Sequence, residues 1–114
     1  MSLADEVFTR LSLSEPLSLE VIRVALDDIS TFDKKQHDYG PTNIAAFGEV
    51  GVIVRAQDKL ARLRNLSKVL NPKAGEPSNE SIEDSWRDLS VYGMIARLCL
   101  AKKWPGSPEQ GAGG

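Results

Sequence analysis

The stretch from Glu80 to Leu98 constrains the fold of this chain more than any other, because acids and apolar residues share one side of a single helix. At about 100° per residue, that side is formed in order by Glu80, Asp84, Asp88, Val91, Ile95 and Leu98. A second apolar face lies roughly opposite and consists of Ile82, Trp86, Leu89, Gly93, Ala96 and Leu100. Burying ionised carboxylates costs several kcal/mol each unless a cation neutralises them. We therefore expect a central helix with neighbours on two sides and a metal ion, an arginine or a lysine beside its acids.

The rest of the chain also has helical spacing. A short helix is expected over residues 4–11, and a long one over about 17–36, which ends where Gly40 and Pro41 stop it. Thr42 or Asn43 caps a second long helix that runs to about residue 70, and a loop rich in proline leads into the central helix. These segments predict an all-α fold: a small bundle with three long helices and a short N-terminal one, over residues 1–104. A flexible tail is expected over residues 105–114.

Length and charge limit the classes of function. A chain of 114 residues forms one small domain, and we expect a second copy to cover its exposed apolar surface in a homodimer or homotetramer. The net charge of −2 and the pI near 5.4 argue against general nucleic-acid binding. The lone Cys99 forms no internal disulfide, which favours a reduced, cytoplasmic location. The N-terminal residues contain no long apolar run, so neither a signal peptide nor a membrane span is expected.

Asp84 and Asp88 are the first candidates for chemistry. They lie one helical turn apart, with Glu80 one turn earlier, and such carboxylates repel one another unless a hard cation lies between them. Magnesium or manganese, bound by carboxylates and water, fits this arrangement. The alternative is a solvated acidic first turn that the helix dipole stabilises.

Glu49 is a second anomaly, because it aligns with Ile53 and Ala56 on a face where apolar residues are expected. An acid in that position needs a partner. Two interpretations remain open at this point: a structural salt bridge with an arginine, or contact with a metal ion or ligand.

Basic residues follow Glu49 on the same helix. Arg55, Asp58, Lys59 and Arg62 recur at three- and four-residue spacing. One interpretation is ordinary surface pairing around Asp58, which contributes only about 0 to 1 kcal/mol per pair. The other is that Lys59 and Arg62 face the acids of the central helix and bind phosphates. Spacing alone does not decide between them.

The turn before this helix contains groups that suit a nucleotide base. Tyr39 offers a ring for stacking, and Asn43 offers an amide for hydrogen bonding. His37 is the only histidine, so neither a zinc site nor a serine triad is supported. No glycine loop has the pattern that binds phosphate, since Gly48-Glu49-Val50-Gly51 lacks both the motif and a preceding strand.

Two runs of this sequence resemble a known group of proteins. FGEVGVIVRAQDKLARLRNL at 47–66 and NESIEDSWRDLSVYGMIA at 79–96 are similar to the nucleotide-modification-associated domain of small phage and bacterial proteins. They are also similar to the MazG-like branch of the all-α nucleoside triphosphate pyrophosphatases. The resemblance covers residues 38–98, and its most specific parts are Arg-x-x-Asp-Lys-x-x-Arg and Glu-Asp-x-x-x-Asp-Leu-x-x-Tyr.

The resemblance implies a helical bundle, completed by oligomerisation, that binds Mg²⁺ or Mn²⁺ through carboxylates on two adjacent helices. The implied reaction is hydrolysis of a nucleoside triphosphate to a nucleoside monophosphate and pyrophosphate. The family pattern has Glu-Glu-x-x-Glu on one helix and Glu-x-x-Asp on the next. Here Asp84 and Asp88 stand at four-residue spacing, and Ser85 replaces the usual glutamate.

The hypothesis that follows assigns a role to each group. Glu49, Asp84 and Asp88 would be catalytic and hold metal, with Glu80 or Asp58 as further ligands. The β and γ phosphates would be bound by Arg55, Lys59 and Arg62, and the base or sugar would be contacted by Tyr39, Asn43 or Tyr92. The expected substrate is a deoxynucleotide, with a weak preference for a purine such as dGTP. The alternative is a non-catalytic helical module that binds a nucleotide or a protein in a nucleotide- or DNA-modification pathway.

Overall fold

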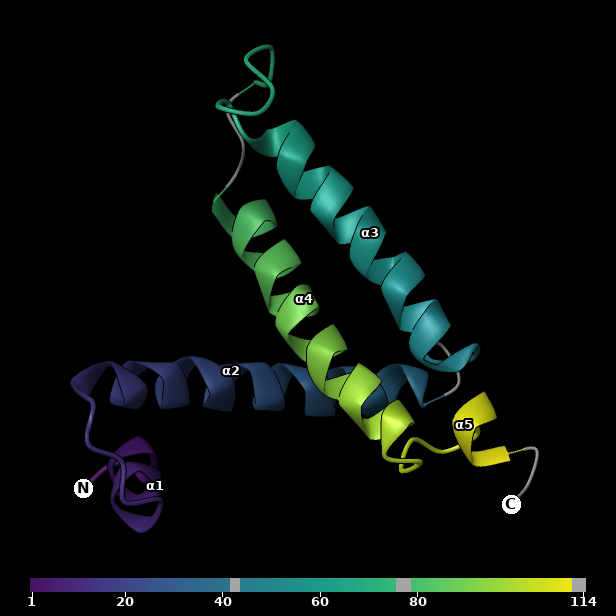
Figure 1. Ribbon diagram of the computed structural model, residues 1–114. Helices are drawn as coiled ribbons and strands as arrows, with labels where there is room; N and C mark the ends of the chain where they lie inside the picture. Colours follow the sequence, from purple (N-terminus) through teal and green to yellow (C-terminus); the bar gives the residue numbers. More distant parts are fainter. Residues whose placement is uncertain (42–43, 76–78, 112–114) are drawn as a thin grey trace. The chain divides into compact units, whose positions relative to one another are not determined.

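The structure is a computed structural model that describes residues 1–41, 44–75 and 79–111, without the side chains of residues 79–81. The helices are α1 (Leu3–Arg10), α2 (Pro16–Tyr39), α3 (Gly48–Leu66), α4 (Asn79–Leu100) and α5 (Pro108–Gly111). The described ranges contain no strand, which confirms the predicted all-α class. The chain divides into two compact units, Met1–Asp38 and Tyr39–Gly114 (Figure 1). None of the helices, as far as they are described, is long and apolar enough to cross a membrane.

The first unit contains α1 and most of α2. The N-terminus of α1 is fixed by a capping box, in which Ser2 Oγ accepts from the Asp5 N–H at 3.1 Å and Asp5 accepts from the Ser2 N–H at 3.1 Å. The helix ends at Arg10, and Ser12, with a φ of 54°, lets the Leu13 N–H reach back to the Phe8 carbonyl at 3.1 Å. Pro16 then begins α2, which confirms the helices expected over 4–11 and 17–36.

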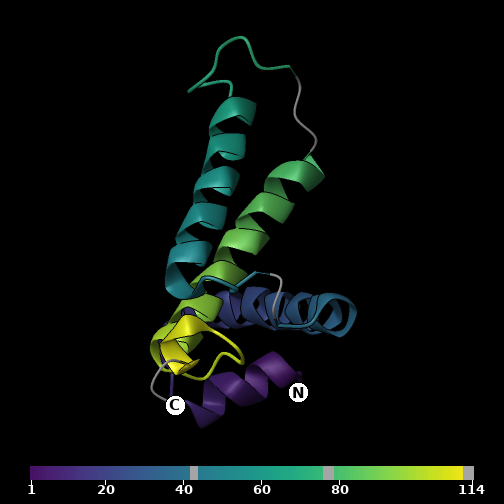
Figure 2. The same cartoon turned by 90° about the vertical axis from the view of Figure 1, so that its right-hand side faces the viewer.

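In the second unit, α3 and α4 run side by side in opposite directions as a hairpin (Figures 1 and 2). Each helix has one buried or half-buried stripe at alternating three- and four-residue steps, the spacing of helices that pack closely along their length. On α3 the stripe consists of Val52, Ala56, Lys59, Leu63 and Leu66. On α4 it consists of Ser85, Asp88, Tyr92, Ile95 and Cys99. Lys59 and Asp88 thus occupy positions where a helical hairpin ordinarily has apolar residues.

These stripes match the predicted core faces in part, since Val91 and Ile95 of the predicted α4 face are buried. Ile53, which was expected on the buried face of α3, is exposed, whereas Ala56 of the same predicted face is half-buried and Val52 is buried. On α4, Trp86 and Leu100 of the predicted second apolar face are also exposed. The buried side of α3 passes through Gly48, Val52 and Ala56, and this face also carries Lys59 toward α4.

The helix α3 is shorter than the predicted segment of about 43–70. It begins at Gly48, whose φ of 66° is left-handed, and its N-cap residue Phe47 makes no side-chain capping bond. It ends where Ser67 becomes extended and Ser67 Oγ accepts from the Leu70 N–H at 3.2 Å. The predicted caps Thr42 and Asn43 lie outside the described residues.

The segment after α4 packs against the start of the second unit. The helix ends at Leu100 because Lys102 adopts a φ of 60° and the Lys103 N–H bonds the Leu98 carbonyl at 2.9 Å. Trp104 is buried and donates its indole N–H to the Pro41 carbonyl at 2.8 Å. Sequence composition predicts a flexible tail from residue 105; the structure has a buried Ser107 and the short α5 there.

Candidate functional site

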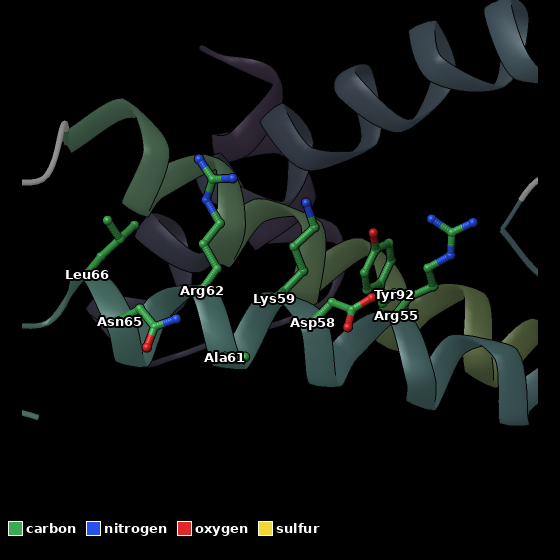
Figure 3. Close-up of a pocket in the computed structure, with 8 residues that line it drawn as sticks. All are labelled: Arg55, Asp58, Lys59, Ala61, Arg62, Asn65, Leu66 and Tyr92. Carbon is green, nitrogen blue, oxygen red and sulfur yellow. The ribbon is translucent and has the colours of Figure 1, made fainter. Parts of the chain in front are cut away.

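A groove of about 540 Å³ lies along α3 on the side that α4 borders, and we call it the α3 groove. It is wide open to solvent, and Figure 3 shows long side chains following one another along the helix and reaching into it. Tyr92 is its only lining residue from α4 within the described part of the chain. The lining residues from α3 are Arg55, Asp58, Lys59, Ala61, Arg62, Asn65 and Leu66.

Lys59 connects the α3 groove to the acids of α4. Its Nζ lies 2.8 Å from Asp88 Oδ2, and the two side chains are 29% and 16% exposed. Both residues lie on the facing stripes of the hairpin, so the helix packing itself brings them together. A hydrogen bond to a charged group contributes about 1.5–3 kcal/mol, and the fixed position of the pair gives the hairpin one register.

The electrostatics of the α3 groove are dominated by cations. The hydrogen bond that Lys59 donates to Asp88 holds the pKa of Lys59 above its usual range, although burial and the neighbouring Arg62 act in the opposite direction. Arg55 lies one turn before Lys59 and Arg62 one turn after it, and both guanidinium groups extend from the same side of α3 (Figure 3). The three predicted phosphate-binding residues therefore line one open surface together.

The predicted acids whose side chains are described do not come together as one cluster. Asp84 is 56% exposed and accepts a hydrogen bond from Arg87 at 2.9 Å, while Glu83 bonds the same arginine at 3.3 Å. Asp58 lines the α3 groove, whereas Asp88 is engaged by Lys59. The side chain of Glu80 is not among those that the structure describes. Arg87 was not assigned a role by the sequence reasoning, although its spacing from Glu83 and Asp84 indicates such pairs.

Glu49 lies at the start of α3, away from the groove lining. Its backbone N–H donates to Glu109 Oε2 at 2.8 Å, and this bond lowers the pKa of the Glu109 carboxyl. A Cβ at Gly48 would lie 2.1 Å from Glu109 Oε1, so only glycine leaves room for the carboxylate there. Glu109 thereby supplies the capping acceptor that Phe47 lacks. No local pattern predicts this contact, because the partners are 60 residues apart.

The same end of the unit buries Cys99. Burial raises the pKa of its thiol, and the negative charges of Glu109 and Glu49 act in the same direction. The thiol is therefore a poor nucleophile at neutral pH, and it completes the packed stripe of α4.

The predicted base-binding residues are divided by the structure. Tyr92 lines the α3 groove, but Tyr39 is 65% exposed and does not line it, and Asn43 lies outside the described residues. Asn65 and Leu66 line the groove and were missed. Their three- and four-residue steps from Arg62 were the available signal, because those steps continue the same face of α3.

The predicted metal site stays a prediction. Within the described ranges, no three histidine, cysteine, aspartate or glutamate side chains come together as metal ligands. Asp84 and Asp88 are each held by a cationic side chain instead. Chemically, the arrangement is suited to binding an anion with several negative charges.

Comparisons with protein-family models, with curated proteins and with solved structures found no match to this chain. The α3 groove and its charges therefore carry the functional argument.

Proposed function

We propose that the protein is a nucleoside triphosphate pyrophosphohydrolase that binds the triphosphate of its substrate in the α3 groove. The observation that carries this proposal is the row Arg55, Lys59, Arg62 in one groove, with Lys59 already holding a carboxylate at 2.8 Å. Guanidinium and ammonium groups are the usual protein ligands of phosphate oxygens. A volume of about 540 Å³ is within the range of small-molecule sites.

The groove also offers groups for the nucleoside. Tyr92 presents a ring beside the cations, and Asn65 presents an amide at the end of the row opposite Arg55. Aromatic rings stack on bases, and amides exchange hydrogen bonds with base edges or sugar hydroxyls. The proposed substrate is a deoxynucleoside triphosphate in phage or bacterial nucleotide metabolism, with a purine such as dGTP as the first to test.

The reaction breaks one bond and forms one bond. Water attacks the α phosphorus, the bond from that phosphorus to the bridging oxygen breaks, and pyrophosphate leaves with the bonding electron pair. Asp58, the carboxylate that lines the groove, accepts the proton of the water. The three cations stabilise the negative charge that develops on the departing phosphates. Magnesium or manganese enters this proposal only as the counter-ion that arrives with the substrate.

The experiment is release of pyrophosphate from each common ribo- and deoxyribonucleoside triphosphate, with Mg²⁺ or Mn²⁺ in the buffer. Wild type should release pyrophosphate from at least one of them, and Lys59→Met should lose most of that activity. Lys73→Met is the matched control, because it removes the same charge from an exposed position in the α3–α4 loop. No pyrophosphate from any nucleotide, or full activity of Lys59→Met, would refute the proposal.

A non-catalytic nucleotide- or protein-binding module is the second candidate. The observation that favours it is the pairing of Asp84 with Arg87 and of Asp88 with Lys59, together with the lack of a metal-ligand cluster among the described residues. Isothermal titration calorimetry with a non-hydrolysable triphosphate separates the two. Binding without turnover of the hydrolysable nucleotide supports the module.

We also propose a homo-oligomer, either a dimer or a tetramer. The support for an oligomer is an exposed apolar patch at the start of α3. It consists of Phe47, Val50 and Val54, which also line a shallow hollow there. Exposed apolar patches of this kind mark protein interfaces. Sedimentation equilibrium tests the proposal, and a monomer at all concentrations would contradict it.

A further inference from the structure

Asp88 occupies Lys59 in the way that a phosphate would. A carboxylate oxygen lies 2.8 Å from the ammonium nitrogen, within the groove where the proposed function places the substrate. We propose that Asp88 is an internal competitor for Lys59, which an incoming anion must displace, and that this competition restricts the groove to condensed phosphates. The inference rests on the proposed function and adds to it a rule for which anions bind.

The competition follows from the exchange of one charge-assisted hydrogen bond for another. An anion that contacts only Lys59 gains about as much as the protein loses when Asp88 leaves, so little net affinity remains. An anion that also reaches Arg55 and Arg62 gains further contacts, because among the described residues neither guanidinium is held in an ion pair as Lys59 is. Binding therefore requires an anion long enough to contact several cations.

The dimensions of α3 set that length. Arg55 and Arg62 are seven residues apart, which corresponds to about 10 Å along a helix. A single phosphate cannot contact all three cations across this distance, whereas a chain of three phosphates can follow the row from Arg55 past Lys59 to Arg62. A nucleoside monophosphate left after cleavage is then too short to hold Lys59 against Asp88, and re-formation of the pair favours its release.

The competing explanation is that Lys59–Asp88 only fixes the register of the hairpin. A register pair predicts that neutralising Asp88 lowers stability and leaves anion affinity unchanged or weaker. A competitor predicts the opposite sign for affinity. The affinity of the wild-type and variant proteins for simple anions therefore distinguishes the two roles.

The experiment is isothermal titration calorimetry of inorganic tripolyphosphate and of orthophosphate, without divalent metal, on the full chain. The variants are Asp88→Asn and the matched control Glu83→Gln. Glu83 is on the same helix, pairs with Arg87 and is 72% exposed, so its substitution removes one negative charge without touching Lys59. Wild type should bind tripolyphosphate and show no binding of orthophosphate at millimolar concentration.

Asp88→Asn should bind tripolyphosphate about tenfold more tightly, which corresponds to about 1.4 kcal/mol, and should bind orthophosphate measurably. Because the exchange costs the same for either anion, orthophosphate should gain at least as much as tripolyphosphate. Glu83→Gln should change neither affinity by more than about twofold, since exposed charges are screened. In the Lys59→Met background, Asp88→Asn should not increase the affinity for tripolyphosphate, because the ammonium group for which Asp88 competes is absent.

Several results would overturn the inference. Unchanged or weaker tripolyphosphate binding by Asp88→Asn refutes it while leaving the proposed function standing. A gain that grows with the charge of the anion, that Glu83→Gln reproduces, or that persists in Lys59→Met shows simple repulsion and also refutes it. Wild type that binds no tripolyphosphate also refutes the inference, whereas the proposed function is decided separately by pyrophosphate release in the presence of Mg²⁺ or Mn²⁺. Thermal unfolding of each variant shows whether it is folded. If Lys59→Met does not fold, the affinities of Asp88→Asn and Glu83→Gln relative to wild type decide between a competitor and a register pair.

Discussion

Substitution of Gly48 tests two features of the second unit, the left-handed turn that begins α3 and the capping of that helix by Glu109. Gly48 has a φ of 66°, and a Cβ there would lie 2.1 Å from Glu109 Oε1 and 2.4 Å from Oε2. Gly48→Ala therefore has two consequences. The left-handed conformation costs a residue with a Cβ about 1–2 kcal/mol, and the Glu109 carboxylate must leave the N-terminus of α3.

Gly93→Ala is the matched comparison. Gly93 lies inside α4, and nothing lies within 4 Å of the position of its Cβ. Alanine in a helix interior is more stable than glycine by about 0.5–1 kcal/mol. The same substitution is thus expected to destabilise at one position and stabilise at the other, and the two variants should differ by about 1.5–3 kcal/mol.

The assay is urea unfolding followed by tryptophan fluorescence. Both tryptophans of the chain, Trp86 and Trp104, lie in the second unit, so the signal reports that unit alone. In a thermal scan the difference corresponds to about 4–8 °C per kcal/mol for a domain of this size. A Gly48→Ala protein as stable as wild type would show that the left-handed turn and the Glu109 cap are absent. In the Gly48→Ala background, Glu109→Gln should have little further effect.

Three further predictions concern single groups. Because the Glu49 N–H holds the pKa of Glu109 below its ordinary 4.5, the ionised carboxylate stabilises the fold above pH 4.5, and this contribution is lost as the pH falls through the lower folded-state value. Urea unfolding of Glu109→Gln should accordingly show a weaker loss of stability below pH 4.5, and an acid limb identical to wild type would contradict this. The pKa of Asp5 is lowered chiefly by the Ser2 hydroxyl, so Ser2→Ala should raise it toward 3.8 in an NMR titration, whereas an unchanged value would exclude the capping box. Burial should make Cys99 unreactive toward a thiol reagent until urea unfolds the protein, and rapid labelling of the native state would show that it is accessible.

Local pattern predicted the helices well, and long-range packing decided the rest. The spacing of apolar residues identified α1, α2 and α4 closely, because helix periodicity is a property of neighbouring residues. The face of α3 was predicted only in part: Ala56 lies on the packed stripe, but Ile53 is exposed, since Ile53 and Val52 are equally apolar and only the partner helix selects between them. That selection is what places Lys59 opposite Asp88.

The candidate site shows the same division. The grouping of Arg55, Lys59 and Arg62 was predictable from helical spacing, and the structure places them in one groove. Spacing could not decide whether Asp84 binds a metal ion or an arginine. Arg87, which binds it in the structure, lies three residues away, and Asp88, the other predicted metal ligand, lies four residues away. The role of Glu109 was beyond local reasoning altogether, since a carboxylate near the C-terminus carries no sign of which helix end it caps. Whether the acids bind metal remains a prediction.

The capping of α3 by Glu109 has a practical consequence for anyone preparing this protein. A run of glycine, proline and serine after Trp104 invites truncation for crystallisation or fusion. Cutting the chain there would remove the acceptor of the Glu49 N–H and leave the first turn of α3 without its carboxylate. Affinity tags and fusion partners are therefore better attached after Gly111, with a linker long enough to keep α5 in place.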